Sequence, residues 1–187
     1  MIVDVWTVSL EVERAPTLSP EEQTRAARFI FERDRVKWAR ARTALRTVLA
    51  QYAGTNPGDL VFAYGENGKP RLEGVTGVEF NLSHAGAWAM VAVALGPAVG
   101  VDLEAIRLDV NIADLLRRVG ERDLPTSRED LFQVWTRREA RTKATGGQLM
   151  RTPIGDLRLV DLAAPEGYRA ALAMVGHDPE VRYRSAI

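Results

Sequence analysis

The stretch "GVEFNLSHAGAWAMVAVALGPAVGVDLEAI", residues 77–106, predicts three consecutive strands. Its apolar runs are interrupted at Ala85-Gly86 and again at Gly96-Pro97, and residues of these kinds end strands and form turns. Short turns of this type favour antiparallel neighbours. The stretch therefore predicts a small, mainly antiparallel sheet at the centre of the fold.

Helices and further strands are predicted on both sides of this stretch. Ser19 followed by Pro20 is typical of a helix start, and a second apolar stripe predicts a helix that ends near Gly54. Further helices are predicted over 111–120 and from Ser127 to Gly146, and further strands over 1–11, 59–72 (with a turn at Asn67-Gly68), 156–161 and 168–174.

Two helix patterns resemble each other. "KWARARTALR" (37–46) and "VWTRREARTK" (134–143) both place a tryptophan and several arginines on a helix, and each is accompanied by strands. We therefore expect an α+β fold of two similar halves, each a small mainly antiparallel sheet packed against helices and related by a pseudo-twofold. The halves would be residues 1–97 and 98–187.

Composition narrows the class of protein. The 187 residues contain no cysteine, which excludes disulfides, thiolate catalysis and cysteine-based zinc sites. Lys plus Arg (25) equals Asp plus Glu (25), so the chain lacks the basic excess of a nucleic-acid binder. Its apolar runs are too short to span a bilayer and no basic leader opens it, so we expect a cytoplasmic protein without a membrane partner. A locally basic run over 25–46 suits a small polyanion, although a solvated helix face is the alternative.

Two carboxylates end the third strand of the central stretch. Because side chains alternate along a strand, Asp102 and Glu104 point to one side and Leu103 to the other. Such a pair can converge on one hard cation. The alternative is that the strand surfaces here and that water solvates both acids.

A third acid continues an apolar helix stripe. Leu131, Phe132 and Trp135 form this stripe, and Glu139 occupies its next position with Lys143 one turn later. An ordinary ion pair between Glu139 and Lys143 is the alternative. Together with the strand pair, however, Glu139 predicts an all-oxygen site for magnesium or manganese.

Further polar residues suit phosphate binding. Ser83 and His84 stand at a strand end where both could donate hydrogen bonds to a phosphate, although an ordinary exposed strand end would look the same. Adjacent side chains on a strand point apart, so no Ser-His triad is implied. Lys69 at the predicted turn could reach an anion or simply be solvated.

These segments resemble the 4′-phosphopantetheinyl transferase superfamily, in its surfactin-synthetase-activator (Sfp) type. The resemblance rests on "NGKPRL" (67–72), "FNLSHAGAWAMVAVA" (80–94), "VGVDLE" (99–104) and "WTRREARTKATGGQL" (135–149), and spans about residues 19–150. It implies a magnesium-dependent transferase that moves 4′-phosphopantetheine from coenzyme A to a serine of an apo acyl or peptidyl carrier protein and releases 3′,5′-ADP. On this resemblance, residues 1–97 would supply the nucleotide and phosphate contacts, and residues 98–187 the metal ligands and the catalytic helix. A monomer could then build the whole site.

The resemblance also implies roles for individual residues. Glu139 would be the base for the carrier serine, directly or through water, and Lys143 would stabilise or protonate the leaving phosphate. The implied metal ligands are Asp102, Glu104 and Glu139, and the implied coenzyme A contacts are Ser83, His84, Lys69, Lys143, Lys37 and Arg25.

The chain departs from the family pattern at a few positions. Arg138 replaces the usual lysine before Glu139, and Glu22 stands where a basic phosphate contact is expected. Between Glu104 and Trp135 only Glu121 resembles the end of the usual central motif. A metal-dependent nuclease and a non-catalytic module that binds coenzyme A or a carrier are the competing hypotheses.

Overall fold

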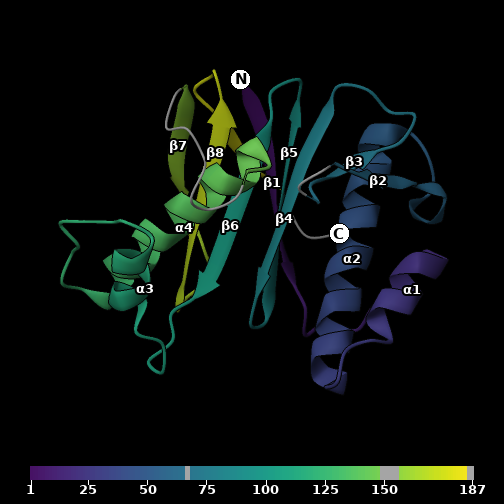
Figure 1. Cartoon of the computed structure of the whole chain (residues 1–187). Helices are drawn as coiled ribbons and strands as arrows, with labels where there is room; N and C mark the ends of the chain where they lie inside the picture. Colours follow the sequence, from purple (N-terminus) through teal and green to yellow (C-terminus); the bar gives the residue numbers. More distant parts are fainter. Residues whose placement is uncertain (66–67, 148–155, 185–187) are drawn as a thin grey trace.

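A computed structural model of the chain describes residues 1–65, 68–147 and 156–184 (Figure 1). Strands and helices alternate irregularly along it, as in an α+β protein. In chain order the elements are β1 (Ile2–Ser9), α1 (Pro20–Ala26), α2 (Glu32–Ala53), a short 3₁₀ helix (Pro57–Asp59), β2 (Phe62–Tyr64), β3 (Pro70–Leu72), β4 (Val78–Ala85), β5 (Trp88–Leu95), β6 (Val99–Ala105), α3 (Ile112–Arg118), α4 (Arg128–Thr145), β7 (Leu157–Leu162), β8 (Tyr168–Val175) and β9 (Glu180–Arg184).

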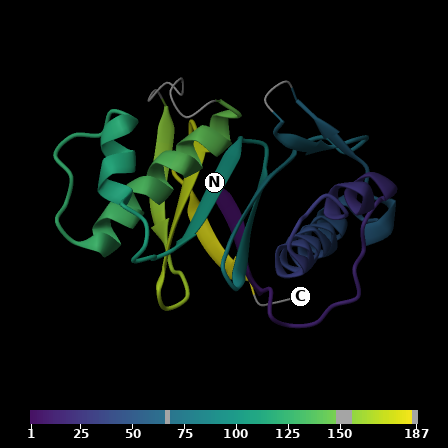
Figure 2. The same ribbon diagram turned by 60° about the horizontal axis from the view of Figure 1, so that its bottom comes forward.

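The described strands form small sheets between two groups of helices. One sheet has the order β4-β5-β1-β9, a second has the order β6-β8-β7, and β2 pairs with β3. Helices α1 and α2 lie on one side of the molecule and α3 and α4 on the other (Figures 1 and 2). All pairings are antiparallel except β1 with β9. The predicted α+β class with small, mainly antiparallel sheets is confirmed, and the pseudo-twofold stays a prediction.

The central stretch forms its three strands as predicted, but only the first turn makes a hairpin. Strands β4 and β5 pair antiparallel from Val78↔Leu95 to Ala85↔Trp88. The second turn does not pair β5 with β6, because β6 pairs with β8 in the other sheet. Val99, Val101 and Leu103 of β6 pack into the same core as the side chains of β5, so the two strands meet through side chains rather than edge to edge.

Two main hydrophobic clusters hold the layers together. The first lies between the two larger sheets and includes Val3, Met90, Val101 and Leu172, all fully buried. The second packs α2 against the first sheet through residues such as Leu45 and, from the strands, Val8, Phe80 and Val93. Burial of apolar area of this kind supplies most of the driving force for folding, and the second cluster fixes α2 relative to the first sheet.

The helix boundaries follow the predicted signals. Ser19 accepts a hydrogen bond from the Glu22 amide, and the Glu22 carboxylate accepts one from the Ser19 amide, which is a complete capping box. Ser127 caps α4 in the same position, and Gly54 and Gly146 end α2 and α4 in the left-handed conformation. Within the described residues no helix is long and apolar enough to cross a bilayer.

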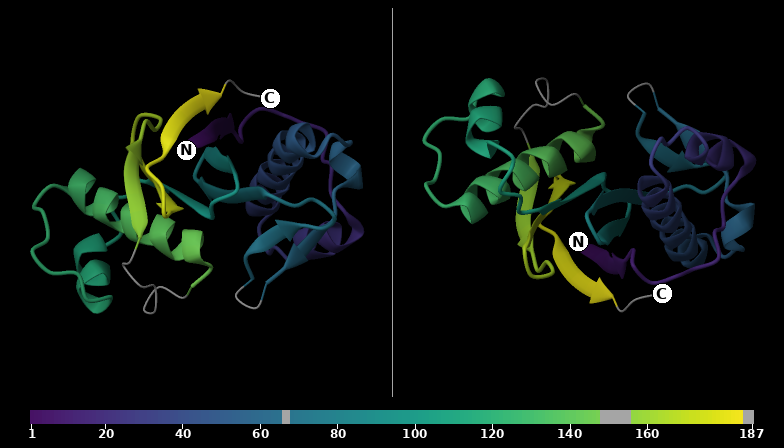
Figure 3. Two further views of the ribbon diagram at one scale, coloured as in Figure 1. Left: turned by 90° about the horizontal axis from the view of Figure 1, so that it is seen from above. Right: turned by 90° about the horizontal axis from the view of Figure 1, so that it is seen from below.

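The last strand was not predicted. The sequence predicts a polar end after β8, but β9 runs parallel to β1 and extends the first sheet (Figure 3). Its side chains are mostly exposed, so it lacks the apolar alternation that reveals a strand.

The predicted strands β7 and β8 are confirmed. Of the predicted turn at Asn67-Gly68, Asn67 lies outside the described residues, and Gly68 has φ +76°.

Candidate active site

Strands β4 and β6 and helix α4 lie next to one another (Figure 1), and one side chain from each of them meets the other two. The Lys143 Nζ donates to Asp102 Oδ1 at 2.6 Å and to Ser83 Oγ at 3.0 Å, and Ser83 Oγ donates to Asp102 Oδ1 at 3.0 Å. The Asp102 side chain is only 3% exposed, whereas Lys143 is 27% exposed. We call this triangle the Ser83–Asp102–Lys143 junction. It joins three of the residues that the sequence singled out.

The closeness of α4 and β6 depends on a glycine. A Cβ at Gly100 would lie 2.2 Å from the Ala140 carbonyl oxygen and 2.3 Å from the Ala144 nitrogen, which are backbone atoms of α4. The helix backbone therefore rests directly on the strand at this point. Asp102 lies two residues further along the same strand face, which brings it beside Lys143.

Glu104 and Glu139 complete an acidic cluster around the junction. Both are half-buried, and both pKa values are raised, first by burial and then by the charge of Asp102. The Lys143 charge opposes this rise at both residues. Asp102 is thus close enough to repel both Glu104 and Glu139, and repulsion of this kind is what a bound cation relieves.

The described residues are compatible with a hard cation, although the side chains do not enclose one as they lie. Across residues 1–65, 68–147 and 156–184, no three aspartate, glutamate or histidine side chains are grouped so that they could hold a metal ion. Asp102 Oδ2, however, is buried and has no hydrogen-bond partner within the protein. A buried carboxylate oxygen without a partner is costly, and it is the hard oxygen ligand that magnesium prefers.

His84 lies beside the junction at the end of β4. The residue has an exposed surface, yet enough protein surrounds its ring to lower the pKa of His84 by desolvation. The positive charge of Lys143 lowers this pKa further. The hairpin turn after it is pinned from the other sheet, because the Ala87 amide donates to the Tyr168 hydroxyl at 3.1 Å. That hydroxyl would lie 2.4 Å from a Cβ on Gly86, where φ is +54°, so a larger residue would strain the backbone and displace Tyr168.

The predicted cationic contacts are spread more widely. Lys37 pairs with Glu11 at 3.2 Å, and the Arg25 guanidinium lies 5.6 Å from the centre of the Trp38 ring. Lys69 is directed between the two sheets and contacts Glu79 and backbone carbonyls. The structure therefore brings Ser83, Lys143 and the acids together, and it places Lys37 and Arg25 on the α1–α2 side.

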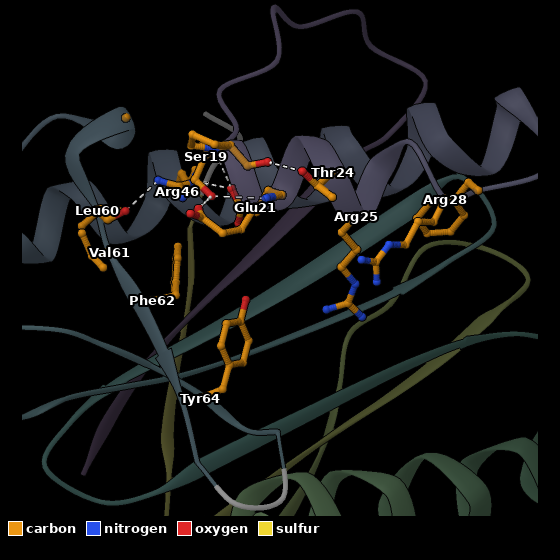
Figure 4. Close-up of a pocket in the computed structure, with 14 residues that line it drawn as sticks. Ser19, Glu21, Thr24, Arg25, Arg28, Arg46, Leu60, Val61, Phe62 and Tyr64 are labelled. Carbon is orange, nitrogen blue, oxygen red and sulfur yellow. Dashed lines mark hydrogen bonds and ion pairs between the residues drawn. The ribbon is translucent and has the colours of Figure 1, made fainter.

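A large pocket lies between α1 and β2 (Figure 4). It has a volume of about 1270 Å³, and its walls include Arg25, Arg28, Phe62 and Tyr64. Figure 4 shows Arg25 reaching from α1 and Tyr64 from β2 towards the space between these elements. Two guanidinium groups beside aromatic rings form a site suited to an anionic, aromatic ligand.

Glu22, the acid found where a basic contact is expected, is not available to repel a phosphate. Its buried carboxylate bridges Arg42 and Arg46, and Arg46 also donates to the carbonyls of Pro57 and Leu60. Burial alone would raise the pKa of Glu22, but hydrogen bonds and the arginine charges lower it. Glu22 thus ties α1 to α2 and to the wall of the pocket.

Several site-forming residues could not be assigned from the sequence. Asn81 Oδ1 accepts from the Val101 amide at 2.9 Å and so joins β4 to β6 where no strand ladder links them. The only indication in the sequence is that Asn81 is a polar residue between two apolar neighbours in a predicted strand. Arg138 donates to Glu121 at 2.7 Å, which connects the loop after α3 to the turn of α4 that carries Glu139.

Comparisons with known proteins identify the family of this chain. A family model described as "4′-phosphopantetheinyl transferase, N-terminal" matches residues 7–95. The chain is 35% identical over 162 residues to the 4′-phosphopantetheinyl transferase HetI of Nostoc, an alignment that covers 77% of this chain and 68% of HetI.

Two Bacillus proteins are also similar. Identity is 32% to the transferase psf-1 of Bacillus pumilus, over 70% of this chain and 59% of psf-1. It is 25% to Sfp of Bacillus subtilis, over 69% of this chain and 60% of Sfp. Less than two thirds of either Bacillus protein is therefore covered, whereas HetI is covered over two thirds of its length. With that coverage and 35% identity to HetI, the chain belongs to the family of 4′-phosphopantetheinyl transferases.

Proposed function

We propose that this chain carries out its family's reaction at the Ser83–Asp102–Lys143 junction. The reaction transfers 4′-phosphopantetheine from coenzyme A to a serine of an apo carrier protein and releases 3′,5′-ADP. The observation that carries the proposal is the meeting of Asp102, Lys143 and Ser83 within 3.0 Å, beside two half-buried glutamates. Such a cluster combines metal-binding oxygens with phosphate-binding donors.

Asp102, Glu104 and Glu139 would hold a magnesium ion, with manganese as the nearest substitute. When bound, the ion would neutralise charge that develops on the pyrophosphate as the phosphoanhydride bond breaks. The buried Asp102 Oδ2 without a partner and the raised pKa values of both glutamates support this assignment.

The pocket between α1 and β2 would hold the nucleotide part of coenzyme A. Arg25 and Arg28 supply positive charge for a phosphate group, and Tyr64 supplies an aromatic face for the adenine. Lys37 stays a predicted phosphate contact on the same side of the molecule. The ion pairs of Glu22 with Arg42 and Arg46 support this placement, because these two arginines balance the negative charge of Glu22 at the pocket wall.

The remaining residues would act on the reacting atoms. The carrier serine loses its proton and forms the new oxygen–phosphorus bond, while the bond from that phosphorus to the bridging oxygen breaks. Glu139 would accept the serine proton, for which its raised pKa is suited. Lys143 would stabilise or protonate the leaving phosphate, and Ser83 with His84 would donate hydrogen bonds to phosphate oxygens.

All these residues come from one chain, so we propose that it acts as a monomer, and a cytoplasmic location stays a prediction. The test is intact-protein mass spectrometry of apo carrier proteins incubated with coenzyme A and this protein, with magnesium or with EDTA. A magnesium-dependent gain of one phosphopantetheine group on the carrier serine is expected. Coenzyme A binding without any gain on a panel of carriers would favour the non-catalytic module instead.

A further inference from the structure

The Lys69 side chain lies in the seam between the two larger sheets, and Lys69 does not line the pocket between α1 and β2. Its Nζ is 3.1 Å from the Ala144 carbonyl oxygen, 3.3 Å from the Val99 carbonyl oxygen and 3.4 Å from Glu79 Oε2. The side chain is only 20% exposed. An ammonium group has three N–H donors, and these three acceptors can use all of them.

Two of the acceptors belong to elements that carry residues of the Ser83–Asp102–Lys143 junction. Ala144 directly follows Lys143 in the last turn of α4, where carbonyl groups lack partners within the helix. A lysine at this end satisfies such a carbonyl and interacts favourably with the helix dipole. Val99 begins β6, three residues before Asp102. One ammonium group thus connects the end of α4 to the start of β6.

We propose that Lys69 is a positioning residue that holds the Lys143 turn of α4 against β6, rather than a direct phosphate contact. Its aliphatic part supports this role, since Lys69 Cβ and Cδ would lie 3.7 Å from a Cβ on Gly146, within packing distance of the helix end. To reach a phosphate, Lys69 would have to give up contacts in both halves. The proposal rests on the proposed function only where it assigns catalysis to Lys143.

The first test compares Lys69→Met with Arg137→Met. Arg137 also ties α4 to a strand, through Asp161 at 2.5 Å, but its side chain is 45% exposed and takes no part in the junction. Because small displacements of a catalytic group are costly, we expect Lys69→Met to lower kcat by roughly 10- to 100-fold. Affinity for coenzyme A, measured by calorimetry, should stay within about twofold. Arg137→Met should leave both quantities unchanged.

A double-mutant cycle tests whether Lys69 acts through Lys143. In a Lys143→Met background, adding Lys69→Met should lower the transfer rate no further, because the group being positioned is already absent. Full additivity of the two losses would overturn the proposal. So would a coenzyme A affinity that falls about tenfold in Lys69→Met with kcat unchanged, since this split is typical of a phosphate contact.

Hydrogen exchange supplies a readout that needs no activity. The amides in the last turn of α4 should exchange faster in Lys69→Met than in wild type, while those of α2 should not change. If Lys69→Met does not fold, Lys69→Gln is measured instead, and because it keeps a donor for the Ala144 carbonyl, its changes in kcat and exchange should have the same direction but be smaller. Absent transfer in wild type would contradict the proposed function alone, and unchanged exchange in the variant would contradict the positioning role.

Discussion

Lys143 Nζ lies 2.6 Å from Asp102 Oδ1, and this ion pair joins the last turns of α4 to the middle of β6. Asp102 is almost fully buried in the pair, so its charge is little screened by water. The same ammonium group donates to Ser83 on β4. One lysine therefore links the helix with strands of both sheets.

Lys143→Met should lower kcat by roughly 100-fold, which is typical for loss of a group that stabilises charge in the transition state. Affinity for coenzyme A should fall much less. Lys37→Met is the comparison, because Lys37 lies on the α1–α2 side and is predicted to contact a phosphate. It should weaken coenzyme A binding with little change in kcat. Equal losses of kcat and affinity in Lys143→Met would instead make Lys143 a simple phosphate contact.

Gly100→Ala should displace α4 from β6. The new methyl group would overlap backbone atoms of Ala140 and Ala144, which cannot turn aside as a flexible side chain can. We expect a loss of about 1–3 kcal/mol in the free energy of unfolding, as for other overpacked sites, together with a strong loss of transfer. Gly58→Ala is the control for stability, because its Cβ would meet only Thr17 at 3.9 Å. Urea unfolding measures the stability of both variants. Equal stabilities would contradict the close contact between α4 and β6 at Gly100.

Glu22→Gln should destabilise the fold by about 3–5 kcal/mol, the range for breaking a buried ion pair from one side. Arg42 and Arg46 would remain buried without their carboxylate. The neighbouring Glu21 is exposed, so Glu21→Gln should leave the stability almost unchanged. Thermal unfolding of the two variants provides the measurement. A similar, small change in both would mean that the buried cluster does not stabilise the contact between α1 and α2.

Asp4 should contribute stability that is lost in acid. Burial acts to raise its pKa, but hydrogen bonds from Arg184 and Tyr52 and the charges of Arg184 and Arg182 outweigh burial and lower it. A carboxyl group with a lowered folded-state pKa stabilises the fold above its unfolded pKa, near 3.8, and this contribution disappears as pH falls through the folded value.

Asp4→Asn should therefore cost about 1–3 kcal/mol near neutral pH, and the difference from wild type should shrink as the solution is acidified. Urea unfolding at a series of pH values between about 6 and 2 measures it. Asp161 in the exposed Arg137–Asp161 pair provides the control, since Asp161→Asn should lower the stability near neutral pH much less than Asp4→Asn does. A difference for Asp4→Asn that does not vary with pH would mean that β9 is not held by this charge.

Local patterns were sufficient to place much of the site. Alternation along β6 put Asp102 and Glu104 on one side with Leu103 in the core, and helical spacing put Glu139 and Lys143 on the α4 face directed at them. The caps at Ser19, Ser127, Gly54 and Gly146 gave the helix ends, because these signals involve residues only a few positions apart.

Features that depend on contacts distant in sequence could not be predicted. The partners of Glu22 are 20 and 24 residues away, and an acceptor of Lys69 is 75 residues away. The crossing of β6 into the other sheet and the return of β9 to β1 depend likewise on tertiary packing, which no short window of sequence contains.

The most direct measurement is the rate at which wild type and Glu139→Gln load an apo carrier protein at saturating coenzyme A and magnesium. Intact-protein mass spectrometry follows the loading, and coenzyme A affinity is measured alongside. We predict transfer by wild type, at least roughly 100-fold slower transfer by Glu139→Gln, and similar affinities for coenzyme A. A near-wild-type rate for Glu139→Gln would contradict the assignment of the acidic cluster as the catalytic centre.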